Sequence, residues 1–382
     1  MKVKLGDIFE IGSGGTPSKS HPEYYGGDIP WVKTGDLKSE YLYKVEDFIT
    51  EEGLKNSSAK LYEPDTVLIA MYGATIGATS ILKMDACTNQ ACAAFKKNDK
   101  VIPEYLYYFL KSQKVKFVKD GVGGAQPNIS VGYLKKVEME LPSLDEQRAI
   151  VEVLDKTTNI MVMRNQEIAS LDNLIKARFV EMFGDPIKNP KGWEVVTIGD
   201  IVKEVKYGTS KPAVEGGKYP YLRMNNLTPD GHLDLNDLKY IDISEDEIEK
   251  CVVRKGDVLF NRTNSIELVG KTAVFDLPDD MVIAGYIIRV RLNERMLPEV
   301  LSQYMNLEAL KDILRSMAKG AVNQANINAQ ELQNVKVYLP DMGLQKKFIE
   351  MKEQVDKSKV EVQKALDETQ KLFDSLMQQY FG

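Results

Sequence analysis

The sequence predicts an α+β fold in which two similar globular domains are joined by two long antiparallel helices forming a coiled coil, in a pseudo-twofold arrangement. One observation behind this fold class is an internal repeat. The stretch AQPNISVGYLKKVEMELPSLDEQ, which begins at Ala125, returns in weaker form from Asn323 as NQANINAQELQNVKVYLPDMGLQ. The other is a stretch of about forty residues from Leu144 that contains neither Gly nor Pro, as expected of one long helix.

The repeat keeps one interval in the rear part of each copy. The residues that recur 198 positions later are Asn128, Ile129, Pro142, Gln147 and Gly184, as Asn326, Ile327, Pro340, Gln345 and Gly382. Toward the front, Gly6-Asp7 matches Gly199-Asp200 at an interval of 193, and Val67-Leu68 matches Val258-Leu259 at 191. We therefore divide the chain into a first domain (1–143), a central helix (144–184), a second domain (185–340) and a C-terminal helix (341–382).

Length and composition suit this division, because 382 residues with 43% hydrophobic content can fill two cores. No apolar run reaches the ~20 residues of a membrane span, and the N-terminus lacks the pattern of a secretory signal, so we expect a cytoplasmic protein. Three cysteines and two histidines favour neither a disulfide framework nor a zinc site. With a net charge of −6, any polyanionic partner would have to be met by local patches or by other subunits.

The first domain opens with short β-branched and aromatic runs separated by turn residues, which predict strands. A helix is expected in PEYLYYFLKSQKVKFV, where Pro103 suits the first turn. A Gly-rich loop and the strand VEMEL follow. The second domain repeats this order, with a helix that starts at Pro298.

The long helices are expected at Leu144–Met182 and Leu344–Phe381, each ~55 Å long at 1.5 Å per residue. Their apolar stripes alternate spacings of three and four residues, which predicts a coiled-coil seam with polar interruptions at Thr157, Arg164 and Arg178. The predicted seam residues are Ile150, Leu154, Met161, Ile168, Leu171 and Ile175 in the first helix, and Phe348, Val355, Val362, Leu366 and Phe373 in the second. Gly184 and Pro186 should end the first helix.

Near matches to enzyme motifs fail at a required position. GSGGTP and GVGGAQ carry Pro17 and Gln126 where a dinucleotide-binding loop needs its third glycine, and LVGKTA has Ser265 where a phosphate-binding loop needs one. The chain also lacks a Gly-x-Ser-x-Gly elbow and an Asn/Asp-Pro-Pro-Tyr/Phe motif for a flipped adenine. The sequence therefore predicts no catalytic residue, no metal site and no cofactor bound by this chain.

Loop-borne polar residues are of the kinds that read DNA. Arginine suits a guanine edge, Asn and Gln suit adenine, and Ser, Thr and Lys suit phosphates, although the same types are also ordinary turn residues. The candidates in the first domain are Ser13, Thr16, Ser18, Lys19, Lys33, Thr34, Asn89, Gln90, Lys116, Lys119, Gln126 and Asn128. Those in the second are Thr209, Ser210, Lys211, Arg223, Asn225, Asn226, Asn261, Arg262, Thr263, Asn264, Asn323, Gln324 and Asn326.

Over essentially its whole length the chain resembles the specificity subunit of Type I restriction-modification enzymes. The resemblance rests on LGDIFEIGSGGTPSK, GDIPWVKTGDL, NQACAAF and LPSLDEQRAIVEVLD in the first half. In the second half it rests on YPYLRMNNL, KGDVLFNRTNSIELVGKTAVF and LPDMGLQKKFIEMKEQ. Each motif is weak alone, but their duplicated order, each time followed by a long helix, is highly specific.

The resemblance implies a prokaryotic, non-catalytic subunit whose two target-recognition domains each read one part of a split sequence in double-stranded DNA. It implies antiparallel helices that set the unread gap, for half-sites about one duplex turn apart, ~34 to 36 Å. It also implies two methyltransferase subunits that use S-adenosylmethionine and methylate a flipped adenine at N6. Two restriction subunits would hydrolyse ATP with Mg²⁺.

Two other classes stay open at this stage. A DNA-processing enzyme with an unrecognised catalytic site would turn over DNA as the isolated chain. A coiled-coil scaffold unrelated to nucleic acid would show no salt-dependent DNA binding with its partners present.

Overall fold

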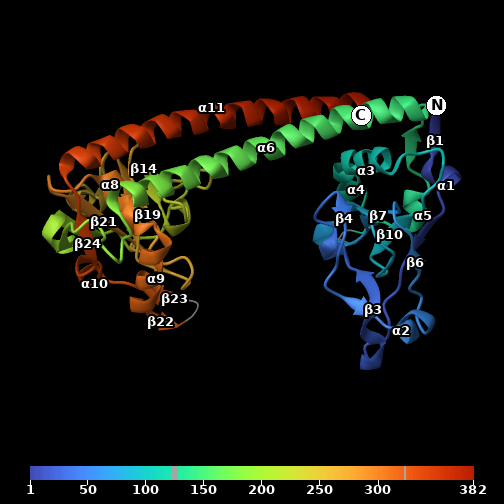
Figure 1. Cartoon of the computed structure of the whole chain (residues 1–382), viewed down its shortest axis with the longest axis horizontal. Helices are drawn as coiled ribbons and strands as arrows, with labels where there is room; N and C mark the ends of the chain where they lie inside the picture. Colours follow the sequence, from blue (N-terminus) through green and yellow to red (C-terminus); the bar gives the residue numbers. More distant parts are fainter. Residues whose placement is uncertain (122–127, 322–323) are drawn as a thin grey trace. The chain divides into compact units, whose positions relative to one another are not determined.

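The computed structural model describes residues 1–121, 128–321 and 324–382. They form two compact units, which we call unit 1 (Met1–Asn165 with Lys364–Gly382) and unit 2 (Gln166–Gln363). Each unit combines sheets, short helices and one segment from each long helix (Figure 1). The α+β class expected from the sequence is confirmed.

One sheet has the same order of four strands in both units, and unit 1 adds a fifth strand to it. In unit 1 its strand order is β2 (Ile11–Ser13), β10 (Cys92–Phe95), β7 (Val67–Ala70), β8 (Thr79–Leu82) and β4 (Tyr41–Leu42). In unit 2 it is β13 (Val202–Tyr207), β21 (Ile287–Leu292), β17 (Val258–Asn261) and β19 (Thr272–Val274). The strand registers make Ser13 the counterpart of Tyr207, because Ser13 pairs with Ala93 as Tyr207 pairs with Ile288.

A second sheet is also duplicated. Unit 1 has the order β5 (Phe48–Ile49), β3 (Tyr25–Val32), β9 (Ala86–Thr88) and β6 (Leu61–Tyr62). Unit 2 has β15 (Lys239–Ile241), β14 (Tyr219–Leu222), β20 (Met281–Ile283) and β16 (Val252–Val253). In both, the two middle strands run parallel while the outer pairs are antiparallel.

Small strand pairs complete each unit. The β1 strand (Lys2–Lys4) pairs with β11 (Glu138–Glu140), and β12 (Glu194–Thr197) pairs with β24 (Lys336–Leu339). Unit 2 has a further sheet of β18 (Thr263–Asn264), β23 (Gln324–Asn326) and β22 (Lys319–Ala321). At the corresponding place in unit 1, Tyr72 and Asn128 form a single antiparallel bridge.

Short helices flank the sheets. Unit 1 contains α1 (Leu5–Ile8), α2 (Glu51–Lys55), α3 (Pro103–Ser112), α4 (Lys114–Asp120) and α5 (Val131–Leu134). Unit 2 contains α7 (Glu245–Cys251), α8 (Pro298–Met305), α9 (Glu308–Met317) and α10 (Ala329–Gln333).

The prediction of one helix from Pro103 onward is wrong, because the chain turns at Gln113 between α3 and α4. The Gln113 side chain donates hydrogen bonds to the carbonyl of Phe381 (3.3 Å) and to Ser112 (3.0 Å). The change of direction buries Phe117 completely, with its ring edge-on to Tyr133. Burial of an aromatic ring therefore outweighs continuation of the helix.

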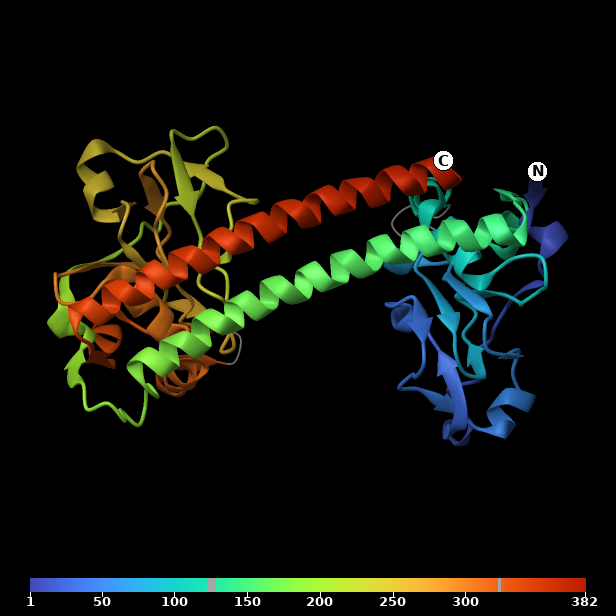
Figure 2. The ribbon, with the colours of Figure 1, turned by 45° about the horizontal axis from the view of Figure 1, so that its top comes forward.

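The two expected long helices are present as α6 (Leu144–Phe183) and α11 (Met342–Phe381). In each unit an α6 segment lies beside an α11 segment (Figures 1 and 2). In unit 1, Leu154 belongs to the same core as Phe373, Met377 and Phe381. Arg164, expected as a polar interruption, donates hydrogen bonds to the Ala365 carbonyl and to Thr369.

In unit 2 the predicted seam residue Phe348 meets two aromatic rings of α6 that the predicted seam did not include. Phe179 and Phe183 both pack edge-on against Phe348, with centroids 5.2 and 5.5 Å away. Lys359 of α11 forms an ion pair with Asp172 of α6. Gly184, at a φ of +88°, follows α6 in the left-handed conformation that suits glycine after a helix.

The remaining predicted seam positions differ in burial. Ile175 and Val355 are buried in the core of unit 2, and Leu171 packs against it. Ile150 and Met161 pack against the core of unit 1. Ile168, Val362 and Leu366 are half-buried.

The recurring glutamines explain part of the repeat. Gln147 accepts a hydrogen bond from the Ile102 N–H (2.9 Å) and donates to the carbonyls of Lys100 and Pro142 (both 3.0 Å). Gln345 accepts from the Leu297 N–H (2.9 Å) and donates to the carbonyls of Arg295 (3.0 Å) and Pro340 (2.9 Å). Both side chains are fully buried, so each glutamine joins the start of a long helix to the loop before α3 or α8.

The isoleucines of the repeated motif occupy equivalent core positions. The Ile129 N–H donates to the Met71 carbonyl (3.0 Å), and the Ile327 N–H donates to the Arg262 carbonyl (2.9 Å). Ser130 and Asn328, each one residue further on, cap α5 and α10. Much of the repeated motif therefore has a structural role. Because Met71 and Arg262 accept equivalent hydrogen bonds, Met71 is the counterpart of Arg262.

The cysteines Cys87, Cys92 and Cys251 are free and buried. Burial raises the pKa of the Cys92 thiol to about 12, with a smaller contribution from the charge of Asp36. Among the described residues, no helix is both long and apolar enough to span a membrane.

Candidate nucleic-acid interface

Two candidate loops of unit 1 lie against each other. Gly14 follows β2, and a Cβ there would lie 1.8 Å from the carbonyl oxygen of Thr88, so only glycine permits this approach. Beyond it, the Thr16 hydroxyl donates a hydrogen bond to the side chain of Gln90. The loop that carries Ser13, Thr16, Ser18 and Lys19 thus meets the loop of Asn89 and Gln90.

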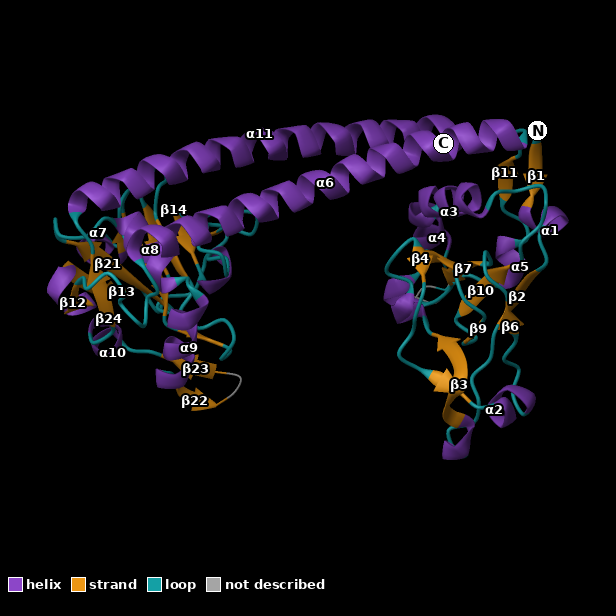
Figure 3. Cartoon of the chain, viewed as in Figure 1, coloured by secondary structure: helices purple, strands orange, loops and turns teal. Residues whose placement is uncertain are grey.

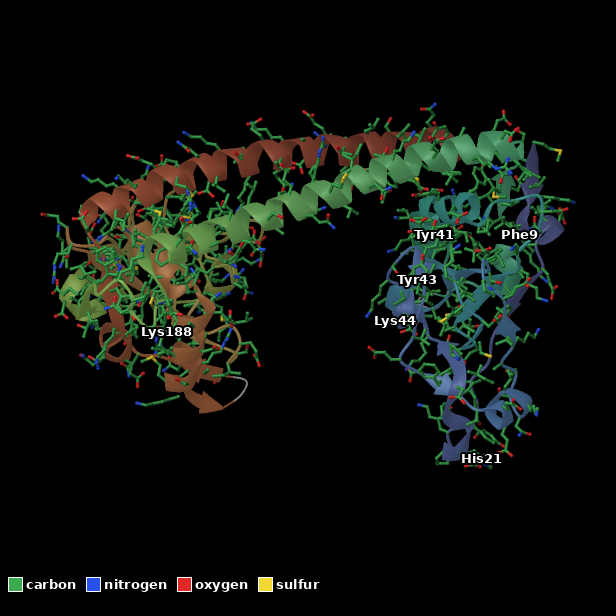
Figure 4. The ribbon with its side chains drawn as sticks, viewed as in Figure 1. Phe9, His21, Tyr41, Tyr43, Lys44 and Lys188 are labelled. Carbon is green, nitrogen blue, oxygen red and sulfur yellow. The ribbon has the colours of Figure 1, made fainter. Side chains whose placement is uncertain are left out.

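The polar tip that follows contains Ser18, Ser20 and His21, with the two serine hydroxyls 2.6 Å apart. Figure 4 shows His21 at the end of unit 1 farthest from α6, with Tyr41 much nearer that helix. Ser18 and Lys19 are exposed. They are therefore accessible to a large ligand.

Other candidates of unit 1 differ in their charge balance. The Lys33 ammonium forms an ion pair with Asp47, whereas Lys116 and Lys119 of α4 are exposed and have no ion-pair partner among residues 1–121 and 128–165. They line a groove with Lys2, Lys114 and Lys136.

Thr34 begins a short 3-10 turn and is half-buried. Asn128 is exposed, and Gln126 falls outside the described residues.

The first candidates of unit 2 repeat the glycine-dependent approach. A Cβ at Gly208 would lie 2.2 Å from the carbonyl oxygen of Ile283. Thr209, Ser210 and Lys211 follow it, and the Lys211 ammonium is paired with Glu247.

The next candidates surround a short 3-10 turn. Arg223 is paired with Asp237 at 2.7 Å, and Asn225 is exposed. Asn226 is buried, accepting a hydrogen bond from the Arg223 N–H and donating one to the Asp234 carbonyl (both 2.8 Å). As placed, Asn226 shapes the turn and offers no free amide to a base.

A buried lysine supports the same turn. Lys271 donates a hydrogen bond to the Met224 carbonyl at 2.7 Å, and burial lowers the pKa of its ammonium. The glycine-lysine-threonine of LVGKTA therefore has a structural role here.

The segment from Asn261 to Asn264 meets β23. Asn261 is fully buried, and its side chain donates to the carbonyls of Thr263 and Tyr286 (both 3.1 Å). Thr263 is buried and donates to Asn326 (3.0 Å), and Asn264 donates to Asn261 (2.8 Å). Asn261 and Thr263 thus hold the segment in place. Gln324 on β23 is exposed, and Asn323 falls outside the described residues.

Arg262 lies within this rigid frame. Its guanidinium carbon is 5.0 Å from the centroid of the Tyr207 ring. The side chains of Tyr207 and Tyr286 are both exposed. Figure 3 shows β22 and β23 at the end of unit 2 away from the long helices.

Sequence reasoning did not single out three exposed aromatic side chains, Tyr72, Tyr207 and Tyr286. Tyr207 could have been found by aligning the repeat strand by strand, since it stands where unit 1 has Ser13. The described residues hold no cluster of three or more His, Cys, Asp or Glu side chains able to bind a metal ion.

Comparison with known proteins decides the family. The domain described as the Type I restriction modification DNA specificity domain matches residues 1–173 and again residues 190–370. The chain belongs to this family. Membership gives it a DNA sequence-specificity role, with one specificity domain for each copy of the repeat.

Several members of the family are similar in sequence. The Type I restriction enzyme MjaIX specificity subunit of Methanocaldococcus jannaschii is 35% identical over 59% of this chain and 57% of that protein. The Type I restriction enzyme EcoKI specificity subunit of Escherichia coli is 22% identical over 92% of this chain and 82% of that protein. The first alignment therefore spans little more than half of the relative.

Solved structures show the same fold. A chain from a study of complex assembly and conformational transition of the type I R-M system gives a TM-score of 0.66 at 19% identity, covering 100% of this chain and 97% of that one. The S subunit of the Type-I restriction-modification system from M. genitalium gives 0.53 at 16% identity, covering 100% and 96%. The fold of the specificity subunits is therefore shared.

Proposed function

We propose that this chain reads a bipartite DNA sequence, with one half-site for each unit. The observation that carries the proposal is the duplicated pair of sheets. Positions that the strand registers make equivalent carry different side chains in the two units. Where unit 1 has Ser13 and Met71, unit 2 has Tyr207 and Arg262. Similar scaffolds with unlike side chains at equivalent positions suit two unlike half-sites.

We propose that the long helices set the number of unread base pairs. Each has 40 residues, or ~60 Å at 1.5 Å per residue, and runs without a break from residues of one unit into residues of the other. A continuous helix resists bending and so suits a spacer.

In this proposal the chemistry resides in partner subunits. Two methyltransferase subunits would use S-adenosylmethionine to methylate a flipped adenine at N6, and two restriction subunits would use ATP and Mg²⁺. Such partners would also supply positive charge to the DNA phosphates, which a chain with a net charge of −6 does not supply overall.

The test is the methylation pattern of the host genome with and without the gene, followed by reconstitution of the complex from purified subunits. We expect methylated adenines in one split sequence that depends on this chain. Methylation of the same sites in its absence would refute the proposal.

A further inference from the structure

Arg262 differs from the other arginines in its pairing. Carboxylates pair with Arg148, Arg178, Arg223, Arg254, Arg289, Arg291, Arg295 and Arg315. Arg164 is bound to α11. Within residues 128–321 and 324–363, Arg262 has no carboxylate partner. Its Nη1 donates a long hydrogen bond to the Gly285 carbonyl (3.4 Å), and no described atom accepts one from its buried Nε.

The structure nevertheless holds the Arg262 side chain in one direction. Its guanidinium lies over the face of Tyr207, whose hydroxyl accepts a hydrogen bond from the Ala329 N–H (2.8 Å). The Arg262 backbone is fixed on both sides, since its N–H donates to the Tyr286 carbonyl and its own carbonyl accepts from the Ile327 N–H (both 2.9 Å). A guanidinium ordered before binding loses little side-chain entropy when it meets a ligand.

The chemistry of this side chain suits one base. The planar guanidinium can donate two parallel hydrogen bonds to the O6 and N7 atoms of guanine in the major groove. Beside it lies Tyr286, whose carbonyl accepts a hydrogen bond from the Arg262 N–H and whose ring is exposed. The Tyr286 side chain can contact an adjoining base.

We propose that Arg262 reads a guanine in the half-site of unit 2 and that Tyr207 positions it. The inference rests on the proposed function and names the base that this site recognises. Unit 1 has no equivalent pair, because Met71 is buried and Ser13 has no ring. The contact therefore belongs to one half-site only.

The experiment uses the complete methyltransferase complex and duplexes that carry its recognition sequence. Each guanine is replaced in turn by 7-deazaguanine, which lacks the N7 acceptor, and the dissociation constant is measured. With the wild-type chain we expect one guanine of one half-site to show a loss of roughly 5- to 150-fold. With Arg262→Ala that sensitivity should vanish.

Further variants separate the roles. Arg262→Lys keeps the charge but replaces the planar guanidinium by an ammonium group, so the guanine preference should weaken while the salt dependence is kept. Tyr207→Phe keeps the ring under Arg262 and should keep the preference, whereas Tyr207→Leu should weaken it. Arg295→Ala, which removes an arginine paired with Glu194 at 3.0 Å, is the matched control and should leave the preference unchanged.

The outcomes are distinguishable. An affinity loss equal for all sequences, with a salt slope lower by about one, would identify a phosphate contact and overturn the inference. So would an Arg262→Ala complex with wild-type specificity, or a unit 2 half-site without guanine. A wild-type complex with no sequence preference would overturn the proposed function itself. A thermal unfolding transition equal to that of the wild-type chain shows that the variants are folded, and unchanged specificity in the half-site of unit 1 shows that the complex still assembles on DNA.

Discussion

At the scale of single residues, the two buried glutamines link sequence and fold most directly. Each satisfies one backbone N–H and two backbone carbonyls that would otherwise be buried without partners. Such groups cost about 1–3 kcal/mol each when left unpaired. The repeat therefore preserves Gln147 and Gln345 for structural reasons, whatever DNA sequence is read.

Replacing Gln345 by Leu should lower the free energy of unfolding of unit 2 by roughly 2–4 kcal/mol, because three backbone groups lose their partner. Chemical denaturation followed by tryptophan fluorescence is the measurement, since Trp193 lies in unit 2. Gln354→Ala, at an exposed position of α11, is the control and should change stability by less than about 0.5 kcal/mol. Equal effects of the two substitutions would contradict this role of Gln345.

A second residue gives a pH-dependent prediction. Burial raises the pKa of Glu40 above its ordinary value of 4.5, helped by the nearby charges of Asp155 and Glu104 and opposed by Tyr41 and Lys111. Since the folded pKa is the higher one, the charged form costs stability above it, and the cost disappears below pH 4.5. Glu40→Gln should therefore be more stable than the wild type at pH 7, with the difference shrinking toward pH 4.

Thermal unfolding across this pH range is the measurement, and Glu46→Gln, at an exposed position, is the control. A Glu40→Gln variant that is less stable than the wild type at pH 7 would show that the carboxylate is stabilising where it lies. A stability difference from the wild type that is the same at pH 7 and pH 4 would also contradict this prediction.

The sequence could not separate structural amides from accessible ones. Asn226, Asn261 and Asn225 all follow strand-like runs in polar loops, yet only Asn225 is exposed. One of the two carbonyls that accept a hydrogen bond from Asn261 belongs to Tyr286, on a segment that only the sheet brings near. Burial of a polar side chain depends on such long-range pairing, which local residue types do not reveal.

At the scale of elements, the long helices were predictable because their apolar spacing is local and lasts for about forty residues. The break at Gln113 was not predictable, since it depends on the contacts of Phe117 with Tyr133 and of Gln113 with the end of α11. The contacts of Phe179 and Phe183 with the predicted seam residue Phe348 were missed because the seam of the first helix was chosen by strict spacing.

The helices give a prediction about spacing. Four residues inserted in α6 between Asn165 and Gln166, where the chain passes from unit 1 to unit 2, should lengthen the helix by about 6 Å. We expect a longer unread gap with both half-sites unchanged, read from the methylated sites of cells that carry the variant. The control is the same insertion between Pro278 and Asp279, which are both exposed. An altered half-site would contradict the spacer role.

At the scale of the whole molecule, the two units share the order of four strands in each of two sheets but carry different side chains at equivalent positions, such as Ser13 and Tyr207. The duplication was visible in the sequence through the rear motif, which packs against the helices and keeps one interval. The N-terminal parts of the two repeat copies differ in length, so only the strand registers show that Ser13 corresponds to Tyr207.

Exchange of residues 1–143 for the matching segment of another family member should change one half-site and leave the other half-site and the gap as they were. Genome-wide mapping of methylated adenines is the measurement. Since Phe373, Met377 and Phe381 belong to the core of unit 1, the donor segment must keep apolar residues that meet them. Changes in both half-sites would contradict independent reading.

Unit 1 is built from the first and the last stretch of the chain, which affects the order in which the two units can fold during synthesis. Its core includes Phe373, Met377 and Phe381, so a nascent N-terminal portion lacks part of its interior until the ribosome has translated those codons. Unit 2 is continuous in sequence from Gln166 to Gln363 and can close earlier. The portion synthesised first is thus completed last, and a premature stop codon after Gln363 would leave unit 2 intact while exposing the apolar interior of unit 1 to proteolysis.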